Sequence, residues 1–556
     1  MQQPVLALEG GGVPASAVLP KKILRGMGYA LRDDEVVVDS FAGAGGMSCA
    51  IQQAIGRSPD IAINHDEIAI GVHEANHPDT IHFHSSVYAV NPKDVIPRGM
   101  HVGLYWASPD CRSFSRARGK APKSKAVRDL VWICVHWAET VRPRVIAIEN
   151  VREIVDYGPL DEHGKVIKSR KGEFFRDWCE ALRKLGYELE WRLLNAADYG
   201  APTTRIRLFL QARRDGLPIL WPNPTHGRKT DPLVKAGKLQ PWRTAGECID
   251  FSLPTHSIFL TPAQAKSVGC KRPLAATTMR RIARGLFKHV IHNQEPYLIN
   301  YYGEKCEQEG FRGRSMDAPF ATQSTANRFG LVVPLTHHGD DRVYGTGDPF
   351  RTITGANRGE TAYVAPVMVQ TGYGERKNQL PRSLDLKKPL GVVVAGGAKH
   401  AIAAASLTCF NQNAAGSTPG DPFKTVMAGA TRHAYIESSI EGAVDRSREV
   451  EIFLWNHRHL SEKPVTRDSL GRVLVDGVPM RITDIGLRMI TSPELFKAQG
   501  FPTWFDATRT ASGRKTTGEQ QVRLCGNAVA PPVGEAVIRA IFGDVGDAVD
   551  DYALAA

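Results

Sequence analysis

Residues 36–46 read Val36-Val37-Val38-Asp39-Ser40-Phe41-Ala42-Gly43-Ala44-Gly45-Gly46, an apolar run that ends in a polar residue and a glycine-rich turn. The valines predict a buried strand, and the glycines permit the positive φ and close backbone approach of a tight turn. A helix is expected directly afterwards, over 47–56. A strand, glycine turn and helix in this order favour a nucleotide-like ligand, although a plain strand–helix turn would have the same pattern.

The same alternation continues outward from this stretch, from residue 35 to about 213. It predicts a Rossmann-like α/β fold, with a mostly parallel sheet covered by helices on both faces. Ligands of such sheets bind at the carboxyl ends of the strands, where Asp39, Asn64, Ser108 and Glu149 fall. Strands are expected at 35–39, 60–64, 101–106, 144–148, 187–194 and 206–211, and helices at 47–56, 66–76, 126–141 and 172–185.

The middle of the chain has a different character, because Gly, Pro, Thr and Asn become frequent and the β-runs are short. Four similar segments recur there, and their period suggests stacked hairpins that share a β-core. The basic residue of each segment either faces a polyanion or is a solvated loop charge. The prolines of the segments are Pro319, Pro349, Pro389 and Pro422, and the basic residues are Arg328, Arg358, Lys399 and Arg432.

Five regions follow from these patterns. We expect an N-terminal extension (1–30), an α/β domain (31–213), a large β-rich domain with hairpin-like repeats (214–480), a return to the α/β domain (481–545) and a flexible tail (546–556). The return ends in an amphipathic helix near 533–542.

Composition narrows the class of protein. The 556 residues suffice for two or more domains, and the net charge of 70 − 58 = +12 favours a polyanionic partner without establishing one. The nine cysteines contain no Cys-X-X-Cys pair, which favours reduced thiols over a zinc ribbon or a disulfide framework. No metal site is expected. Because we find neither a secretory signal nor a long apolar run, we expect a cytoplasmic protein without a membrane span.

Cys111 is the candidate nucleophile. It lies in Ala107-Ser108-Pro109-Asp110-Cys111-Arg112-Ser113-Phe114-Ser115, directly after an apolar strand. The basic residues of 112–125 would lower the pKa of the thiol and raise its thiolate fraction. This basic stretch also suits a loop that closes over a phosphate backbone. The alternative is a buried structural cysteine.

Two further motifs carry charge to strand ends. Glu149 follows the apolar run 145–148, where its surroundings can hold the carboxyl protonated as a general acid; alternatively it is an acid at a helix amino end. Strand alternation places Arg205 and Arg207 on one side, as cations for phosphate or carbonyl oxygens. The glycine turn lacks a phosphate-binding lysine, so it suits the amino-acid end and ribose of S-adenosylmethionine better than a triphosphate.

Taken together, these motifs resemble the DNA cytosine-5 methyltransferases of prokaryotes and phages. The resemblance implies an S-adenosylmethionine-dependent enzyme that acts on double-stranded DNA, with 31–213 catalytic and 214–480 as the target recognition domain. Six motifs in the family's order are more specific than any one alone. The matching stretches are 39–46, 108–111, 149–151, 195–207, 488–502 and 521–529.

The resemblance also implies roles for individual residues. Cys111 would add to C6 of a flipped cytosine, Glu149 would contact N3, and Arg207 would hold O2. Arg205 would support the loop or a phosphate. The implied cofactor-binding residues are Asp39, Phe41, Ala42, Gly43, Gly45, Gly46, Asn64, His65, Pro109, Asn527 and Ala528.

Four positions depart from the family's pattern. Asn64 stands where the family has a ribose-binding Glu, and Ser86 stands where it has an acid near the adenine amino group. Asp110 intervenes between Pro109 and the nucleophile, and Thr203 replaces a Gln before the paired arginines. These departures predict a weaker or adapted cofactor pocket.

Three other functions remain open at this stage. An RNA cytosine-5 methyltransferase of the same fold would be expected to have a smaller recognition region than 214–480. A catalytically inactive, methyltransferase-like DNA-binding protein is consistent with the altered cofactor positions, although Cys111, Glu149 and both arginines are retained. Transfer of a modified one-carbon group is a narrower option. We expect a monomer associated with the nucleoid of a bacterial or phage-infected cell, with a restriction endonuclease as a candidate partner.

Overall fold

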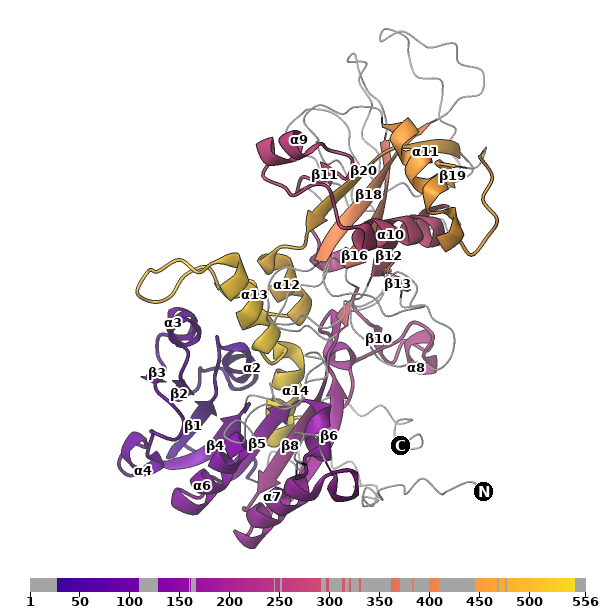
Figure 1. Ribbon diagram of the computed structural model, residues 1–556. Helices are drawn as coiled ribbons and strands as arrows, with labels where there is room; N and C mark the ends of the chain where they lie inside the picture. Colours follow the sequence, from indigo (N-terminus) through magenta and orange to yellow (C-terminus); the bar gives the residue numbers. More distant parts are fainter. Residues whose placement is uncertain are drawn as a thin grey trace.

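The computed structural model describes residues 28–109, 129–159, 161, 167–244, 246–250, 253–291, 446–467, 470–475 and 478–545, together with the short strands named below between 297 and 409 (Figure 1). Cys111, Asp110, the prolines and basic residues of the expected repeat, and the expected tail 546–556 lie outside the described residues.

A seven-stranded sheet forms the first body of the molecule, in the strand order β3-β2-β1-β4-β5-β8-β6. The first five of these strands run parallel, and β8 is antiparallel to both β5 and β6. The prediction of a mostly parallel α/β sheet is therefore confirmed. The strands are β1 (Glu35–Ser40), β2 (Ile61–Asn64), β3 (Ile81–His84), β4 (His101–Ala107), β5 (Val145–Asn150), β6 (Glu188–Asn195) and β8 (Ile206–Arg213).

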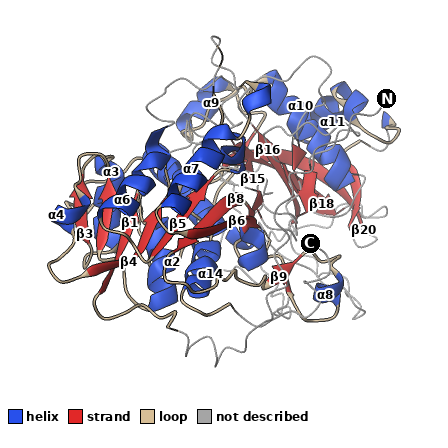
Figure 2. Cartoon of the chain, turned by 90° about the horizontal axis from the view of Figure 1, so that it is seen from below, coloured by secondary structure: helices blue, strands red, loops and turns tan. Residues whose placement is uncertain are grey.

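Helices cover both faces of this sheet, as Figure 2 shows. Along β1, Val37 joins the hydrophobic cluster of α2 (Gly46–Ile55) and α14 (Pro531–Ile541). Its neighbour Val38 joins the cluster of α6 (Ile133–Thr140) and α7 (Glu173–Lys184) on the opposite face. This two-residue alternation is the side-chain period of a strand buried on both sides. It explains the continuous apolar run in the sequence.

A second, nine-stranded sheet lies beyond α12 and α13 from the first (Figure 1). Helices α10 (Ala276–Gly285) and α11 (Ser447–Asn456) contribute buried side chains to the same hydrophobic cluster as β20, so this body is mixed rather than purely β. Its strands are β11 (His256–Ser257), β12 (Tyr297–Ile299), β13 (Gly313–Ser315), β15 (Gly330–Leu331), β16 (Ala362–Gln370), β17 (Ser383–Leu384), β18 (His400–Cys409), β19 (Arg472–Val475) and β20 (Val478–Met489).

The chain returns to the first body after β20. This strand spans the boundary expected at residue 480, and the return begins with α12 (Ser492–Gln499) and α13 (Gly518–Asn527). None of the described helices combines the length and the hydropathy needed to cross a membrane. The remaining short elements are α3 (Glu67–Asn76), α4 (Pro92–Val95), α8 (Pro232–Lys235), α9 (Pro262–Ser267), β7 (Thr203–Thr204), β9 (His226–Gly227), β10 (Gln240–Pro241) and β14 (Phe320–Ala321).

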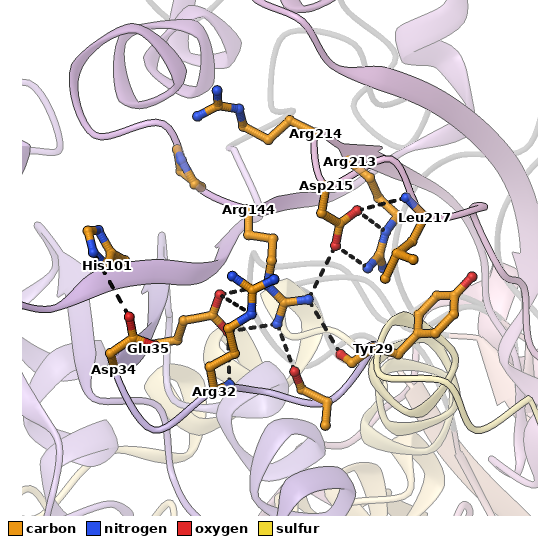
Figure 3. A network of polar contacts seen from close by, with 12 residues as sticks. Tyr29, Arg32, Asp34, Glu35, His101, Arg144, Arg213, Arg214, Asp215 and Leu217 are labelled. Atoms are coloured by element: carbon orange, nitrogen blue, oxygen red, sulfur yellow. Dashed lines mark hydrogen bonds and ion pairs between the residues drawn. The ribbon is translucent and has the colours of Figure 1, made fainter. Parts of the chain in front are cut away.

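A buried ion-pair network ties together the amino end of β1, the residue before β5 and the carboxyl end of β8 (Figure 3). Arg144 holds Glu35 through two hydrogen bonds of 2.6 and 2.7 Å, and its third nitrogen lies 3.3 Å from Asp215. Asp215 also accepts a 2.7 Å hydrogen bond from Arg213. Burial would raise the pKa of Asp215, but the hydrogen bond and charge of Arg213, with hydrogen bonds from Leu217 N and Arg144, lower it. Both carboxylates of the network, Glu35 and Asp215, are paired with arginines, and the network lies at the opposite end of the sheet from the carboxyl ends of β1 and β5.

We predict that Glu35→Ala lowers the free energy of unfolding by about 3–5 kcal/mol, because it leaves the buried Arg144 guanidinium without its main partner. Urea denaturation followed by tryptophan fluorescence measures the loss. The matched control is Glu67→Ala, whose 3.3 Å pair with Arg514 is exposed and should contribute less than about 1 kcal/mol. Equal losses in the two variants would show that the network does not stabilise the sheet.

Candidate active site

The carboxyl ends of β1, β2, β4 and β5 meet at one edge of the first sheet. Beyond β1, the Ala42 amide donates to Ile63 O of β2 at 3.2 Å. Beyond β4, the carbonyl of Pro109 accepts a 3.1 Å hydrogen bond from the Asn150 side chain at the end of β5. Because these strands are parallel and cross-linked at their ends, Asp39, Asn64, Pro109 and Glu149 are brought to a common edge.

The glycine turn after β1 has an unusual backbone. Phe41, Gly43 and Gly45 all have positive φ, at 62°, 59° and 103°. For a bulky residue such as Phe41 this conformation costs roughly 1–2 kcal/mol. Such a residue is held by its surroundings, and here the turn is closed by a 3.1 Å hydrogen bond from Gly45 N to Ala42 O. Strain of this kind concentrates at ligand sites.

Helix α2 begins against the last segment of the chain. A Cβ added to Gly46 would lie 2.6 Å from Val529 O and 3.0 Å from the Ala528 side chain, so neither alanine nor anything larger fits without movement. The N-cap of α2 is Gly45, and no side chain caps the helix. Its amino end therefore retains main-chain donors, which suit a carboxylate or phosphate.

Asp39 is a buried carboxylate with one unused oxygen. Only 1% of the residue is exposed, and Oδ2 accepts a 2.7 Å hydrogen bond from Ser48. Oδ1 has no hydrogen-bond partner among the described residues. Burial raises the pKa of Asp39 to about 7, against the smaller opposing effect of Ser48. A buried oxygen without a partner, such as Asp39 Oδ1, gains its missing hydrogen bond when a ligand brings a donor.

The end of β2 leads into a polar pair, Asp66 with Arg523, that the sequence analysis did not single out. Asn64 is 9% exposed, and its Oδ1 accepts a 2.8 Å hydrogen bond from Asp66 N. Asp66 in turn accepts from Arg523 of α13 at 3.2 Å. Burial would raise the pKa of Asp66, but hydrogen bonding to Arg523, with its charge, lowers it. The signal in the sequence was an acid at the predicted amino end of a helix.

Glu149 and Arg207 form an ion pair at the same edge. Arg207 Nε lies 3.1 Å from Glu149 Oε1, and the side chains are 16% and 9% exposed. The approach is not aligned as a hydrogen bond, so Oε1 has no hydrogen-bond partner among the described residues. Arg205 is more deeply buried, and it donates to Gly526 O at 3.2 Å. Thus Arg207 lies beside Glu149, while Arg205 lies against the carboxyl end of α13.

The remaining candidates differ in exposure. Pro109 and Ala528 are buried, whereas His65 and Asn527 are exposed. Of the positions that depart from the family pattern, Ser86 is exposed and Thr203 is fully buried. The structure thus describes every predicted site residue except Cys111, which follows Pro109 by two positions.

Three features of this edge fit a ligand that carries both an amino group and a carboxylate. The first is the unpartnered Asp39 Oδ1, and the second is the uncapped amino end of α2. The third is the open side of Gly43, where an added Cβ would meet no other atom within 4 Å except Phe41 O at 3.9 Å. The described residues contain no cluster of His, Cys, Asp and Glu that could hold a metal ion.

Comparisons with a family model and with individual proteins point to the same protein family. A sequence model described as C-5 cytosine-specific DNA methylase matches residues 36–240 and 414–543, more than half of the chain. Type II methyltransferase M.AquIA of Picosynechococcus is 25% identical over 39% of this chain and 88% of its own length. Type II methyltransferase M.XorII of Xanthomonas oryzae is 33% identical over 35% of this chain and 44% of its own length. The chain therefore spans less than half of the second relative.

Among solved structures, the Entamoeba histolytica methyltransferase EhMeth aligns over 92% of this chain and 99% of its own chain, with 13% sequence identity and a TM-score of 0.42.

We predict that Gly46→Ala destabilises the protein by about 1–3 kcal/mol, because the added methyl group overpacks the contact with Val529. The control is Gly518→Ala, which also changes the first residue of a helix but has no atom within 4 Å of the added Cβ. That variant should be stabilised by about 0.4–1 kcal/mol. Urea denaturation of both variants tests the contact, and a neutral Gly46→Ala would contradict it.

Proposed function

The chain belongs to the C-5 cytosine-specific DNA methylase family, and we propose that it transfers a methyl group from S-adenosylmethionine to C5 of a flipped cytosine in double-stranded DNA, through a covalent adduct at Cys111. The observation that carries the proposal is the Glu149–Arg207 pair, which shares one sheet edge with the glycine turn. A carboxyl and a guanidinium placed together suit the N3 and O2 atoms of a cytosine ring.

S-adenosylmethionine, when bound, supplies an electrophilic methyl group on a sulfonium sulfur. On the protein side, Asp39 Oδ1 would accept from its amino group, and the main-chain donors of α2 would hold its carboxylate. Phe41, Ala42, Gly43, Gly45 and Gly46 would form the turn around it. Asn64, His65, Pro109, Asn527 and Ala528 would complete the pocket.

The chemistry of cytosine explains the need for a nucleophile. C5 alone is a poor nucleophile, but a bond from the Cys111 thiolate to C6 turns C5 into an enamine carbon. Glu149 would protonate or hydrogen-bond N3 as negative charge develops, and Arg207 would hold O2. After C5 takes the methyl group, a base removes the C5 proton, the C6–sulfur bond breaks, and the thiolate is released.

Recognition of DNA is assigned to the second body. We assign target recognition to 214–480 and catalysis to 31–213 together with 481–545. Helix α12 is the first helix after the chain returns to the catalytic domain. The target base is buried in a duplex, so flipping it out would cost a few kcal/mol. The net charge of +12 is consistent with phosphate contacts, which make binding salt-dependent. A monomeric enzyme in the bacterial cytoplasm or nucleoid, with a cognate restriction endonuclease, completes the proposal.

Bisulfite sequencing of DNA from cells that express the protein tests the activity, the modified base and the site together. A purified-protein assay on duplex DNA and on tRNA separates the DNA enzyme from an RNA enzyme of the same fold. Methylation of tRNA alone would overturn the choice of substrate. Absence of methylation on both would favour the inactive DNA-binding protein.

We predict that Cys111→Ser abolishes methyl transfer and leaves DNA binding largely intact, because a serine hydroxyl is a far weaker nucleophile toward C6 than a thiolate. Methyl transfer and electrophoretic mobility shift measure the two properties. Cys270→Ser is the matched control, since Cys270 is partly exposed and lies outside the candidate site. Near-normal turnover of Cys111→Ser would remove the nucleophile assignment.

We predict that Glu149→Gln lowers kcat by roughly 100-fold or more, as expected for the loss of a positioned acid. Gln preserves the size of the side chain, so the packing beside Arg207 is retained. Steady-state kinetics at saturating substrate provide the measurement, and the control is Glu188→Gln at the exposed start of β6. An unchanged kcat would exclude Glu149 from the chemical step.

A further inference from the structure

Two histidines, His73 and His77, pack against the glycine turn, a third, His82, contacts His73, and none of them has a role in the proposed chemistry. His73 lies on α3 and His77 directly follows the last residue of that helix, and both are fully buried, while His82 lies on β3 and is half-buried. A Cβ added to Gly45 would lie 3.0 Å from His77 Nε2 and 3.4 Å from His73 Cδ2. The imidazole rings therefore fill the space under the turn, and their arrangement bears directly on the candidate cofactor site.

A continuous hydrogen-bonded chain runs from one of these rings to the buried carboxylate. Asp39 Oδ2 is 2.7 Å from Ser48 Oγ, which is 2.7 Å from His73 Nε2. The other nitrogen of the ring, His73 Nδ1, is 2.8 Å from His82 Nε2. The chain thus joins the fully buried Asp39 to the half-buried His82 through two buried side chains.

Counting protons assigns a direction to this chain. The Ser48 hydroxyl donates its one proton to Asp39, so it must accept from His73 Nε2–H. Burial lowers the pKa of His73 well below its usual value, and the neighbouring histidines lower it further, so the ring is neutral and its Nδ1 is an acceptor. His82 Nε2 must then donate to it. All three hydrogen bonds point toward Asp39 and favour its ionised form.

We propose that His73 is a positioning residue of the cofactor site, which acts through Ser48 to keep Asp39 ionised, and that His82 is the outer end of a proton relay to Asp39. This inference rests on the proposed function, because it takes the amino group of S-adenosylmethionine as the partner of Asp39 Oδ1. In the relay, a proton taken up at His82 Nδ1 is matched by transfer from His82 to His73, from His73 to Ser48 and from Ser48 to Asp39. Each of the three hydrogen bonds reverses, and no charge remains on the rings.

The other titratable groups near Asp39 are neutral or take no part in the hydrogen-bonded chain from Asp39 to His82. Cys49 and Tyr105 face Asp39, and burial raises the pKa of both groups well above their usual values. The hydrogen bonds of His77 go to Ser58 Oγ at 2.9 Å and Cys49 Sγ at 3.7 Å, and its ring packs beside that of His73 at 4.8 Å without joining the hydrogen-bonded chain. Burial lowers the pKa of His77 to about 4.

The outer end of the chain has one charged neighbour. Burial lowers the pKa of His82, against the opposing charge of Glu74 on α3. His82 is therefore mainly neutral at neutral pH.

The sign of the expected pH dependence follows from Asp39. Burial raises its pKa to about 7, and the ionised form is the one that binds an amino group. As far as Asp39 decides it, affinity for the cofactor is therefore highest at pH values well above 7 and falls as the pH decreases through about 7, by about tenfold per pH unit at the limit.

Titration calorimetry of the full-length protein with S-adenosylhomocysteine, repeated across this pH range, tests the relay. We predict that His73→Phe, which keeps the ring volume and removes the donor to Ser48, moves the pH midpoint of binding upward by about one unit, equivalent to roughly tenfold in affinity below the midpoint. His77→Phe is the matched control, because it changes an equally buried ring four residues later that makes no hydrogen bond to Asp39, Ser48 or His82. Its midpoint should equal that of the wild type, whatever its affinity.

A second measurement on the unmutated protein does not depend on how the variants fold. Nitrogen-15 NMR of the histidine side chains should show both His73 and His82 protonated on Nε2 at a pH slightly above neutrality. A His73 ring protonated on Nδ1, or a His73→Phe midpoint equal to that of the wild type, would overturn the relay alone. Failure of the wild type to bind S-adenosylhomocysteine at any pH would overturn the proposed cofactor, and the relay with it.

Discussion

The contact between Gly46 and the Val529 carbonyl is the constraint on which the site depends. It joins the first turn of α2 to a segment more than 400 residues later in the chain, with no room for a side chain between them. Two other buried contacts hold the same segment, from Arg205 to Gly526 O and from Gln499 to Cys525 O. The second body is therefore inserted between two pieces of one domain, and the candidate active site is complete only when the last piece has docked.

The local patterns of the first body could be predicted from the sequence. Val37 and Val38 belong to opposite clusters, which explains why β1 appears as an unbroken apolar run, and Gly43 and Gly45 after it occupy left-handed positions. Strand β3 was missed because it lies at the sheet edge and has a partly exposed alternation of apolar residues with histidine. The boundary expected at residue 480 lies inside β20. The sequence of a strand does not indicate which sheet the strand will join, so the whole of β20 could not be assigned to the second body.

Contacts between distant residues could not be predicted from the same patterns. The pair of Asp66 with Arg523 and the hydrogen-bonded chain from Asp39 to His82 each join side chains of different elements. Such contacts leave no periodic pattern in the sequence. His73 lies in the last turn of α3 and His77 directly follows that helix, and no sequence pattern singled out either residue. What their rings meet depends on the packing of α3 against the glycine turn, which is a tertiary property.

The charges at the carboxyl ends of β1, β2 and β5 show why the ionisation of Asp39 matters for the proposed cationic ligand group. Asn64 brings no charge to this edge, and the charge of Asp66 is compensated by Arg523. Glu149 is likewise paired, with Arg207. Asp39 has no cationic partner among the described residues; it has Ser48 and an unused oxygen. Because an uncompensated buried carboxylate tends to take up a proton, its charge depends on donors aligned toward it. The directed chain from His82 through His73 and Ser48 provides that alignment, and it leaves Asp39 as the source of negative charge next to the glycine turn.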